Sequence, residues 1–454
     1  MNVFSALNRF GLGARPGEHR RLSDPRGWLS AQLDGPPPVL AADAVPPGTI
    51  GDAIRAFRMA RQADEPRRQQ TRRRLAEIAL AESRAALTVR ATSDRPFVER
   101  LVAFWSNHLC VSAGAKPLVA PLAGRYDREV IRPHVLGRFE DMVLASARHP
   151  AMLIYLDNAQ SIGPSSRGAQ RRGGNGPPRG LNENYARELL ELHTLGVDGG
   201  YTQQDVQELA RVLTGWTVAG LGATAGVPRG ESGEAVRFVF HDALHEPGSK
   251  RVLGVRYDAA GVEEGERAIR ALCHHPSTAR FVARKLVTHF VADEPPPAAV
   301  DRVAQAFRVS DGDLRVTARA LIDAPEVWTD EARKFRTPQD WLVAVLRAFA
   351  VSEASETAPS ILRQLRQPLW SPPSPKGFGD SLPEWADPDA LLNRAELART
   401  VGRRPGPRGS DPRTLRDVFD VPAGSLLDTL LSDRSIPAPE RIALAIAGPA
   451  FQWR

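Results

Sequence analysis

The sequence predicts an all-α protein, a large multi-helical single assembly over residues 1–454 with one small β-hairpin. Apolar residues recur at intervals of three and four through most of the chain, which is the period of an amphipathic helix. Hydrophobic residues make up 42% of the 454 residues and charged residues 25%, so the chain can bury a large core. Alternating, strand-like patterning is confined to one short stretch at 236–254.

Helices are expected where this period follows a capping residue. Asp24-Pro25 is an N-cap followed by proline at the first helical position, and the apolar face of the helix at 95–110 runs through Phe97, Leu101 and Trp105. The expected helices outside the central segment are 24–34, 51–62, 67–91, 95–110, 136–148, 261–274, 276–291, 295–308, 312–323, 338–352, 356–366 and 387–402.

A central helical hairpin is expected at 181–217. Gly196 suits a left-handed C-terminal cap, and Thr202 lies three residues before Asp205, as in a capping box. Just before it, residues 163–180 contain no apolar residue larger than proline or alanine and predict a mobile surface loop. Such a loop beside a polar cluster suits a lid, and a tolerated insertion is the alternative.

Two further segments interrupt the helical pattern. In the β-hairpin insert at 236–254, residues 237–240 are expected to pair with 251–253 across Pro247-Gly248. Residues 368–383 form a proline-rich link that carries Trp370 and Phe378, which makes it too aromatic for a plain solvated linker.

Composition and motifs exclude several classes of protein. The net charge of +7 comes mainly from arginine, and the densest run, at 67–74, suits a solvated helix face, so nucleic-acid binding is disfavoured. No G-x-S-x-G, G-x-x-x-x-G-K-[ST], H-E-x-x-H or strand-linked G-x-G-x-x-G motif is present, which disfavours α/β-hydrolases, NTPases, zincins and dinucleotide-dependent enzymes.

The sequence also bears on location. No window of about 20 apolar residues and no N-terminal export signal is present, so we expect no membrane span and a cytoplasmic protein, or an extracytoplasmic one if the true start lies upstream. Cys110 and Cys273 form no disulfide framework and leave the compartment open.

The strongest candidate site lies on the first helix of the central hairpin. A turn of 100° per residue places Asn184, Arg187, Glu188 and Glu191 within one arc. Two carboxylates there can hold a divalent metal ion, or can work as a general acid beside an ionised partner. The alternative is a solvated face on which Arg187 pairs with Glu191 and Glu188 faces water.

Two other groups of residues are weaker candidates. Asn107 and His108 end an apolar helix face. There Asn107 could bind substrate and His108 could be catalytic, and the alternative is that His108 is a hydrogen-bonded core histidine. In the stretch HDALHE, His241 and His245 have the spacing of helical zinc ligands, against a loop that packs and hydrogen-bonds locally. Lys250 nearby could serve an anionic substrate.

The segment LNENYARELLELHTLGVDGGYTQQDVQELARVLTGWT at 181–217 resembles the signature segment of the domain-of-unknown-function 1800 family. Weaker similarity continues at 104–112, 128–161, 275–293, 334–349 and 368–378 and in the closing GPAFQWR. The resemblance implies a bacterial origin and, as a candidate partner, a sulfatase-like family, domain of unknown function 1501. It implies no particular reaction. Many relatives carry an export signal, which this sequence lacks.

Two functions from different classes remain. The first is a hydrolase or lyase that acts on a polymeric substrate, with Glu188 and Glu191 as acid/base groups or metal ligands and with Asn184 and Arg187 orienting the substrate. A glycan substrate is implied by the resemblance alone. The second is a non-enzymatic helical scaffold that binds the sulfatase-like partner or a surface polymer.

Overall fold

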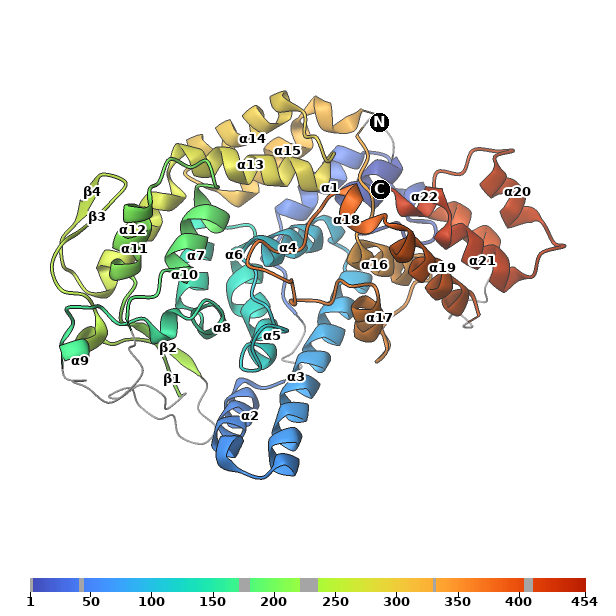
Figure 1. Ribbon diagram of the computed structural model, residues 1–454. Coiled ribbons are helices and arrows are strands. Elements are labelled where there is room, and N and C mark those ends of the chain that lie inside the picture. Colours follow the sequence, from blue (N-terminus) through green and yellow to red (C-terminus); the bar gives the residue numbers. More distant parts are fainter. Residues whose placement is uncertain (1–2, 41–44, 171–179, 221–235, 330–331, 404–410) are drawn as a thin grey trace.

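The computed structural model describes residues 3–40, 45–170, 180–220, 236–329, 332–403 and 411–454 of the chain. Helices dominate these ranges, and the strands in them form two separate two-stranded antiparallel sheets, which confirms the predicted fold class (Figure 1). One connected cluster of buried apolar side chains extends from Ala6 to Phe451. Within the described ranges, no helix is both long enough and apolar enough to cross a lipid bilayer.

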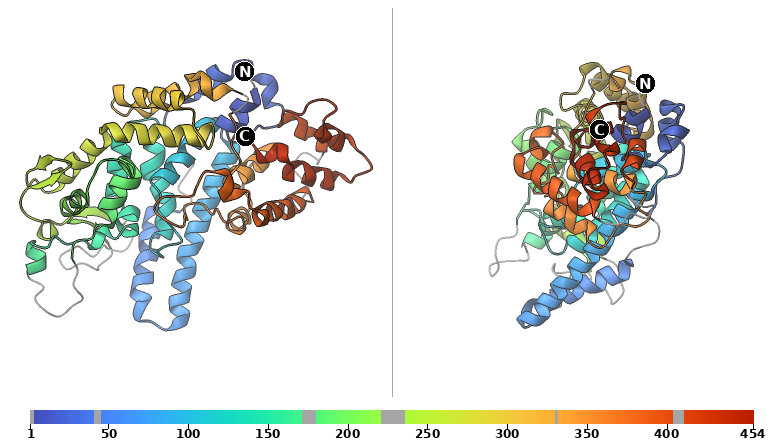
Figure 2. Two further views of the ribbon diagram at one scale, coloured as in Figure 1. Left: turned by 45° about the horizontal axis from the view of Figure 1, so that its top comes forward. Right: turned by 90° about the vertical axis from the view of Figure 1, so that its right-hand side faces the viewer.

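The N-terminal third contains a long helical hairpin that projects from the body, as Figures 1 and 2 show. Asp24 and Asp64 accept hydrogen bonds from backbone N–H groups and cap the first and third helices. The C-terminal half of α3 packs against α16 and α17, while its other half pairs with α2 outside the body. The helices of this third are α1 (Pro25–Leu33), α2 (Pro47–Met59), α3 (Glu65–Thr92) and α4 (Pro96–His108).

The middle of the chain holds the predicted central hairpin. Its first arm is α10 followed by a π-helical turn, and its second arm is α11, which the expected Thr202–Asp205 capping box opens. The helices here are α5 (Ala123–Tyr126), α6 (Arg132–His134), α7 (Phe139–Arg148), α8 (Pro150–Tyr155), α9 (Arg167–Gln170), α10 (Asn184–Glu188) and α11 (Gln203–Val212).

Short 3-10 and π-helical turns connect the longer helices. The π-helical turns are Ser5–Phe10, Asp127–Ile131 and Leu189–Thr194. The 3-10 turns are Glu18–Arg21, Ala60–Gln62, Ala120–Leu122, Asn158–Gln160, Asp242–Leu244, Pro325–Trp328 and Pro412–Asp417.

Strand pairing differs from the sequence expectation. Arg237–Phe240 (β2) pairs with Trp216–Ala219 (β1), whose residues were expected to end or follow the second helix of the hairpin. Gly215 turns the chain out of the helix with φ of 82°. Lys250–Val252 (β3) pairs with Val255–Tyr257 (β4) across a two-residue turn in which both residues have positive φ, so β3 is not available to β2.

Part of the expected mobile loop at 163–180 is ordered. The backbone N–H of Gly163 donates to Leu244, and that of Ser165 donates to the Glu246 carboxylate at 2.8 Å. Ser166 is buried, and α9 follows it. The anchor is a distant acidic side chain, which local composition does not reveal. The rest of the loop, 171–179, lies outside the described residues.

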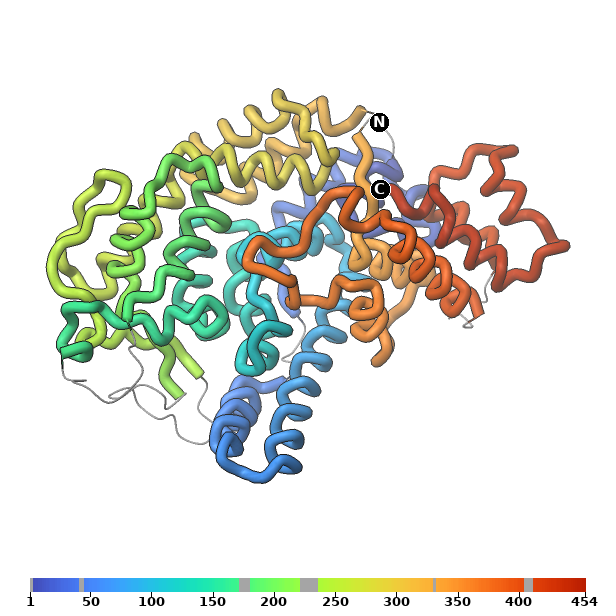
Figure 3. Tube along the Cα trace, viewed as in Figure 1, coloured from blue at the N-terminus to red at the C-terminus, as the bar shows by residue number. Residues whose placement is uncertain are grey.

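The C-terminal half wraps around this body. Residues 368–383 cross the end of α4, and the two termini lie close together, as Figure 3 shows and an Arg454–Arg9 hydrogen bond indicates. The helices are α12 (Val262–Cys273), α13 (Pro276–Phe290), α14 (Pro297–Val309), α15 (Leu314–Asp323), α16 (Pro338–Ala348), α17 (Ala358–Gln364), α18 (Leu382–Trp385), α19 (Pro388–Gly402), α20 (Leu426–Ser432), α21 (Ala438–Ala447) and α22 (Pro449–Gln452).

Buried ion pairs connect these parts. The Arg132 guanidinium contacts Glu99 at 2.8 Å and Asp127 at 2.7 Å, and all three side chains are at most 2% exposed. A second cluster joins Asp340 to Arg100 at 2.9 Å and to the C-terminal Arg454 at 3.0 Å. Because an unpaired charge is costly in a protein interior, these pairs constrain how the elements meet.

Candidate functional site

The polar face of the central hairpin is accessible in the structure. Asn184 is exposed, and Arg187, Glu188 and Glu191 are partly exposed, while Tyr185 on the opposite side of the helix is buried. The helix widens into the π-helical turn Leu189–Thr194 immediately after Glu188, and such turns are frequent at functional sites.

Arg187 and Glu191 have partners other than those expected from spacing. Arg187 pairs with Glu183 one turn earlier, at 3.2 Å, and donates to Gln203 of α11 at 2.9 Å. Glu191 instead accepts a hydrogen bond from the Tyr201 hydroxyl at 3.3 Å. Gln203 is the first residue of the second arm, and Tyr201 lies just before it in the connection between the two arms. Packing of the two arms therefore decides the partners of Arg187 and Glu191.

The Glu188 carboxylate has no hydrogen bond or ion pair within the described residues. Burial and the neighbouring charge of Glu191 raise its pKa above the usual range, against the opposing charge of Arg187. A half-buried carboxylate without a bonded partner is suited to exchanging a proton with a substrate.

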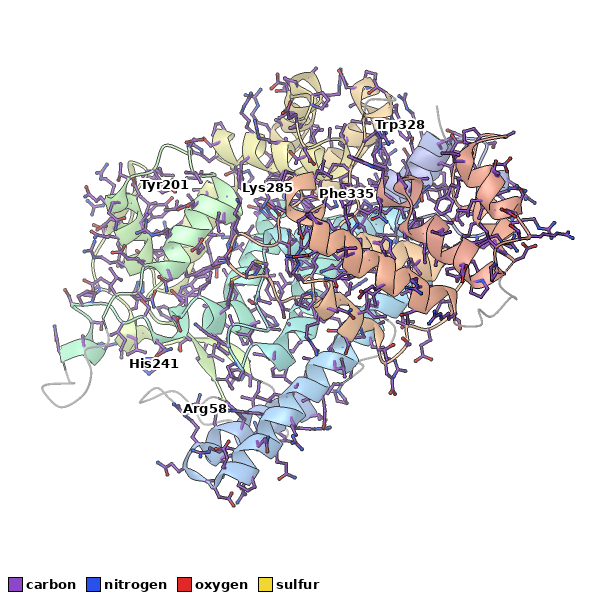
Figure 4. The ribbon with its side chains drawn as sticks, turned by 45° about the vertical axis from the view of Figure 1, so that its right-hand side comes forward. Arg58, Tyr201, His241, Lys285, Trp328 and Phe335 are labelled. Carbon is purple, nitrogen blue, oxygen red and sulfur yellow. The ribbon has the colours of Figure 1, made fainter. Side chains whose placement is uncertain are left out.

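Lys285 of α13 brings the complementary charge to this region. Helix α13 packs against the π-helical turn, and the ammonium group of Lys285 lies 5.5 Å from the centre of the Phe281 ring. No hydrogen bond or ion pair reaches this ammonium group in the described part of the chain. Burial lowers the pKa of Lys285 to about 8, so its proton is exchangeable near neutral pH. Figure 4 labels Lys285 and Tyr201.

The buried Cys110 thiol lies within electrostatic reach of both Glu188 and Lys285. It donates to the carbonyl oxygen of Pro375 at 3.2 Å. Burial raises the pKa of Cys110 to about 12, the charge of Lys285 opposes this, and the charge of Glu188 adds to it. Burial and the charges of Cys110 and Glu188 also raise the pKa of Tyr155 on α8. We call Glu188, Lys285, Cys110 and Tyr155 the central cluster.

His108 lies behind this cluster rather than in its accessible part. Its Nε2 donates to the carbonyl oxygen of His193 at 3.0 Å, and both histidines are 1% exposed. Burial and the charge of Lys285 lower the pKa of His108 well below the usual range and that of His193 to about 3. Both rings are therefore neutral, and the His108 ring is enclosed in the core.

Asn107 holds the segment that covers the cluster. Its amide nitrogen donates to the Phe378 carbonyl at 2.8 Å, and its amide oxygen accepts from the Phe378 N–H at 2.8 Å. The expected substrate-binding amide is thus engaged by the backbone of the proline-rich link. Gly377 lies against the Asn107 carbonyl, where a β-carbon would come within 2.5 Å of the oxygen.

The residues expected as a second metal or anion site form a separate buried network. His245 contacts the Thr214 carbonyl at 2.8 Å and Glu264 at 3.2 Å, and Lys250, which is 3% exposed, pairs with Glu264 at 3.1 Å. A 3-10 turn separates His241 from His245, so the two do not share one helix face. Lys250 is therefore enclosed, which leaves it no access to a substrate.

A metal site is not apparent in the described residues, where no three His, Cys, Asp or Glu side chains are grouped to hold an ion. Glu191 is close enough for its charge to raise the pKa of Glu188. No third side chain of these types joins the two carboxylates within the described residues. The arrangement fits proton transfer better than metal ligation.

Sequence reasoning missed Lys285, Tyr201 and Cys110. Lys285 follows an apolar run on α13, where a lysine resembles an ordinary helix-surface residue. One signal was available, because lysine is rare in this arginine-rich chain. The five lysines are Lys116, Lys250, Lys285, Lys334 and Lys376. Among them, Lys250 and Lys334 are buried and ion-paired, and Lys116 pairs with Asp157.

Comparison with known proteins agrees with the resemblance seen in the central segment. No curated protein and no solved structure matches the chain. The family model described as "Protein of unknown function (DUF1800)" matches residues 5–451, which is nearly the whole chain. The chain therefore belongs to the DUF1800 family.

Proposed function

We propose that this protein is a hydrolase or lyase for a polymeric substrate, in which Glu188 is the general base and Lys285 the general acid. One observation carries the proposal. Glu188 directly precedes the π-helical turn against which the helix of Lys285 packs, neither side chain has a bonded partner in the described residues, and burial shifts their pKa values toward each other. Such opposed shifts at one location are characteristic of acid–base sites.

The protonation states set the roles. Because the pKa of Lys285 is about 8, Lys285 is mainly an ammonium at pH 7 and acts as the acid, while Glu188, whose pKa burial raises, acts as the base in its carboxylate form. The carboxylate takes a proton from water in a hydrolysis, or from a substrate carbon in an elimination. The ammonium gives its proton to the leaving oxygen. Proton exchange with water restores both groups.

A cavity near the start of α10 supports an extended substrate. Its volume is about 610 Å³, and its lining includes Asp157, Gln160 and residues 180–184. Residues 180–184 lead into α10, and Glu188 follows one turn later on the same helix. A volume of this size exceeds what a single reacting group requires. The accessible Arg187, which pairs with Glu183 of the cavity lining, and Gln203 beside it add hydrogen-bond donors next to the cavity.

A pH–rate profile tests the roles. Wild-type protein is incubated with neutral and uronate-containing polysaccharides, and new reducing ends and unsaturated products are measured from pH 5 to about pH 10. We expect activity that falls above about pH 8 as Lys285 loses its proton. Lys285→Arg should keep residual activity that does not decline at alkaline pH, because arginine stays protonated. Lys285→Met and Glu188→Gln should each lower the cleavage rate at least about 100-fold.

Two control variants remove charge nearby without touching the cluster. Arg284→Met alters the exposed neighbour of Lys285, and Asp198→Asn alters an exposed carboxylate beyond the π-helical turn. Both should keep wild-type rates. If Glu188→Gln and Lys285→Met retain full activity, the assignment of acid and base is wrong. If the protein cleaves no polymer but binds a polymer or a sulfatase-like protein, the scaffold function replaces the enzymatic one.

A further inference from the structure

We propose that a second, basic cavity, which shares the lining residues Asp157 and Gln160 with the first, binds a small organic polyanion that carries phosphate or sulfate esters. The cavity is lined by residues of the α2–α3 hairpin, of the segment that follows α4, and of α8 and β1, and its volume is about 540 Å³. We call it the basic cavity. Figure 4 labels Arg58, which lies on the hairpin and lines this space. The charged residues that line it are Arg58, Arg61, Arg68, Arg72, Lys116 and Asp157.

The cations of the basic cavity are only partly neutralised. Lys116 pairs with Asp157 at 2.7 Å. Arg68 pairs with Glu65, a residue outside the lining, at 2.6 Å. The guanidinium groups of Arg58, Arg61 and Arg72 have no hydrogen bond or ion pair within the described ranges. The cavity therefore carries three guanidinium groups that are not neutralised by a described residue.

Mutual repulsion disfavours this arrangement modestly without a ligand, since Arg61, Arg68 and Arg72 are exposed to water. Burial and the charge of Arg61 lower the pKa of Arg58, which shows that the two guanidinium groups interact at a partly desolvated position. A bound anion would offset this repulsion, and guanidinium forks match the oxygen geometry of phosphate and sulfate with paired hydrogen bonds. Arg68 and Arg72 are four residues apart on α3 and so present their forks on the same side.

The remaining walls favour an organic ligand over a bare ion. Phe57, Leu118 and Leu153 supply apolar surface, and Thr71 and Gln160 supply neutral hydrogen-bonding groups. A volume near 540 Å³ is typical of small-molecule sites. Nucleic acid and anionic membranes would call for an extended basic surface rather than a recess with an apolar side.

Asp157 fits this interpretation as a positioning residue. It adopts a left-handed backbone conformation with φ of 62°, rare for a residue other than glycine. Its carboxylate holds the Lys116 ammonium, which also donates to the carbonyl oxygens of Ile154 and Tyr155. Lys116 is thereby fixed at the wall of the cavity, opposite the arginines of the hairpin.

Isothermal titration calorimetry of the full chain with two matched probes tests the proposal. The probes are myo-inositol hexakisphosphate and myo-inositol hexasulfate, which share one ring and differ in the ester, at roughly 0.1 M NaCl. We expect one molecule bound per chain. Arg58→Ala/Arg72→Ala should weaken binding at least tenfold. The tighter probe identifies the ester that the site prefers, and neither outcome depends on the activity of the central cluster.

The control removes the same amount of charge from the same helical hairpin. Arg67 and Arg73 are exposed residues of α3 that do not line the cavity, so Arg67→Ala/Arg73→Ala should change the dissociation constant less than twofold. Equal losses in the two double variants would overturn the proposal, since they would indicate diffuse surface charge. The proposal would also be overturned if neither probe bound. It would be overturned as well if a thymidine oligonucleotide or phosphatidylglycerol vesicles bound more tightly than the probes and the cavity variant did not weaken that binding.

Discussion

Lys285 should lower the stability of the protein at neutral pH, although it is central to the proposed activity. Its ammonium is desolvated and gains no ion pair within the described residues, so Lys285→Met should raise the free energy of unfolding. Placing function ahead of stability in this way is common at active sites.

The magnitude follows from the pKa. Burial lowers the pKa of Lys285 from 10.5 to about 8, and each pKa unit corresponds to about 1.36 kcal/mol. Below pH 8 the folded protein bears the whole free-energy cost of burying the charged ammonium, at most about 3 kcal/mol. Contact of the amine with water makes this cost smaller. Between pH 8 and 10.5 the folded state loses this proton while the unfolded state retains it, so the penalty shrinks, and above pH 10.5 it vanishes.

Urea titrations of wild type and Lys285→Met at several pH values measure this difference. Groups beyond the reach of Lys285 titrate alike in both proteins, so the difference reports Lys285 together with the neighbours whose pKa values its charge lowers, His108, His193 and Cys110. We expect the variant to be more stable at pH 7 and its advantage to decline above pH 8. Arg284→Met, on the exposed neighbour, should change stability by less than about 0.5 kcal/mol. A Lys285→Met variant that is less stable than wild type at pH 7 would refute the reasoning, because the ammonium would then make net favourable contacts.

Two more substitutions test the frame around the central cluster. Arg132→Met should lower the free energy of unfolding by about 3–5 kcal/mol, because it strands the buried carboxylates of Glu99 and Asp127, and a loss below about 1 kcal/mol in urea titration would contradict this. Gly377→Ala should cost more than about 2 kcal/mol, because its φ of 87° disfavours a side chain and the new β-carbon meets the Asn107 carbonyl. Unchanged thermal stability of that variant would show that the link moves freely.

Each of these substitutions has a matched control. Arg138 is 44% exposed, and Arg138→Met should cost at most about 1 kcal/mol. Gly424 also has a positive φ, 76°, but a β-carbon there would meet no atom within 4 Å, so Gly424→Ala reports backbone strain alone. The difference between the two glycine variants isolates the clash with Asn107.

The sequence alone determined the fold class and the accessible face of the central hairpin. Apolar periodicity, capping residues and prolines act over a few residues, and for that reason they predicted most of the long helices, the Thr202–Asp205 capping box and the shared face of Glu188 and Glu191. The burial of Tyr185 opposite that face follows from the same periodicity.

Only the tertiary structure decided which residues meet that face. Lys285 and Cys110 come from segments about 80 to 100 residues away along the chain, and no local pattern specifies contacts at such separations. The strand pairing and the enclosure of Lys250 were likewise fixed by distant partners, β1 and Glu264. Because burial sets both pKa values and access to substrate, the chemistry of a titratable residue depends on the packing around it rather than on its neighbours in sequence.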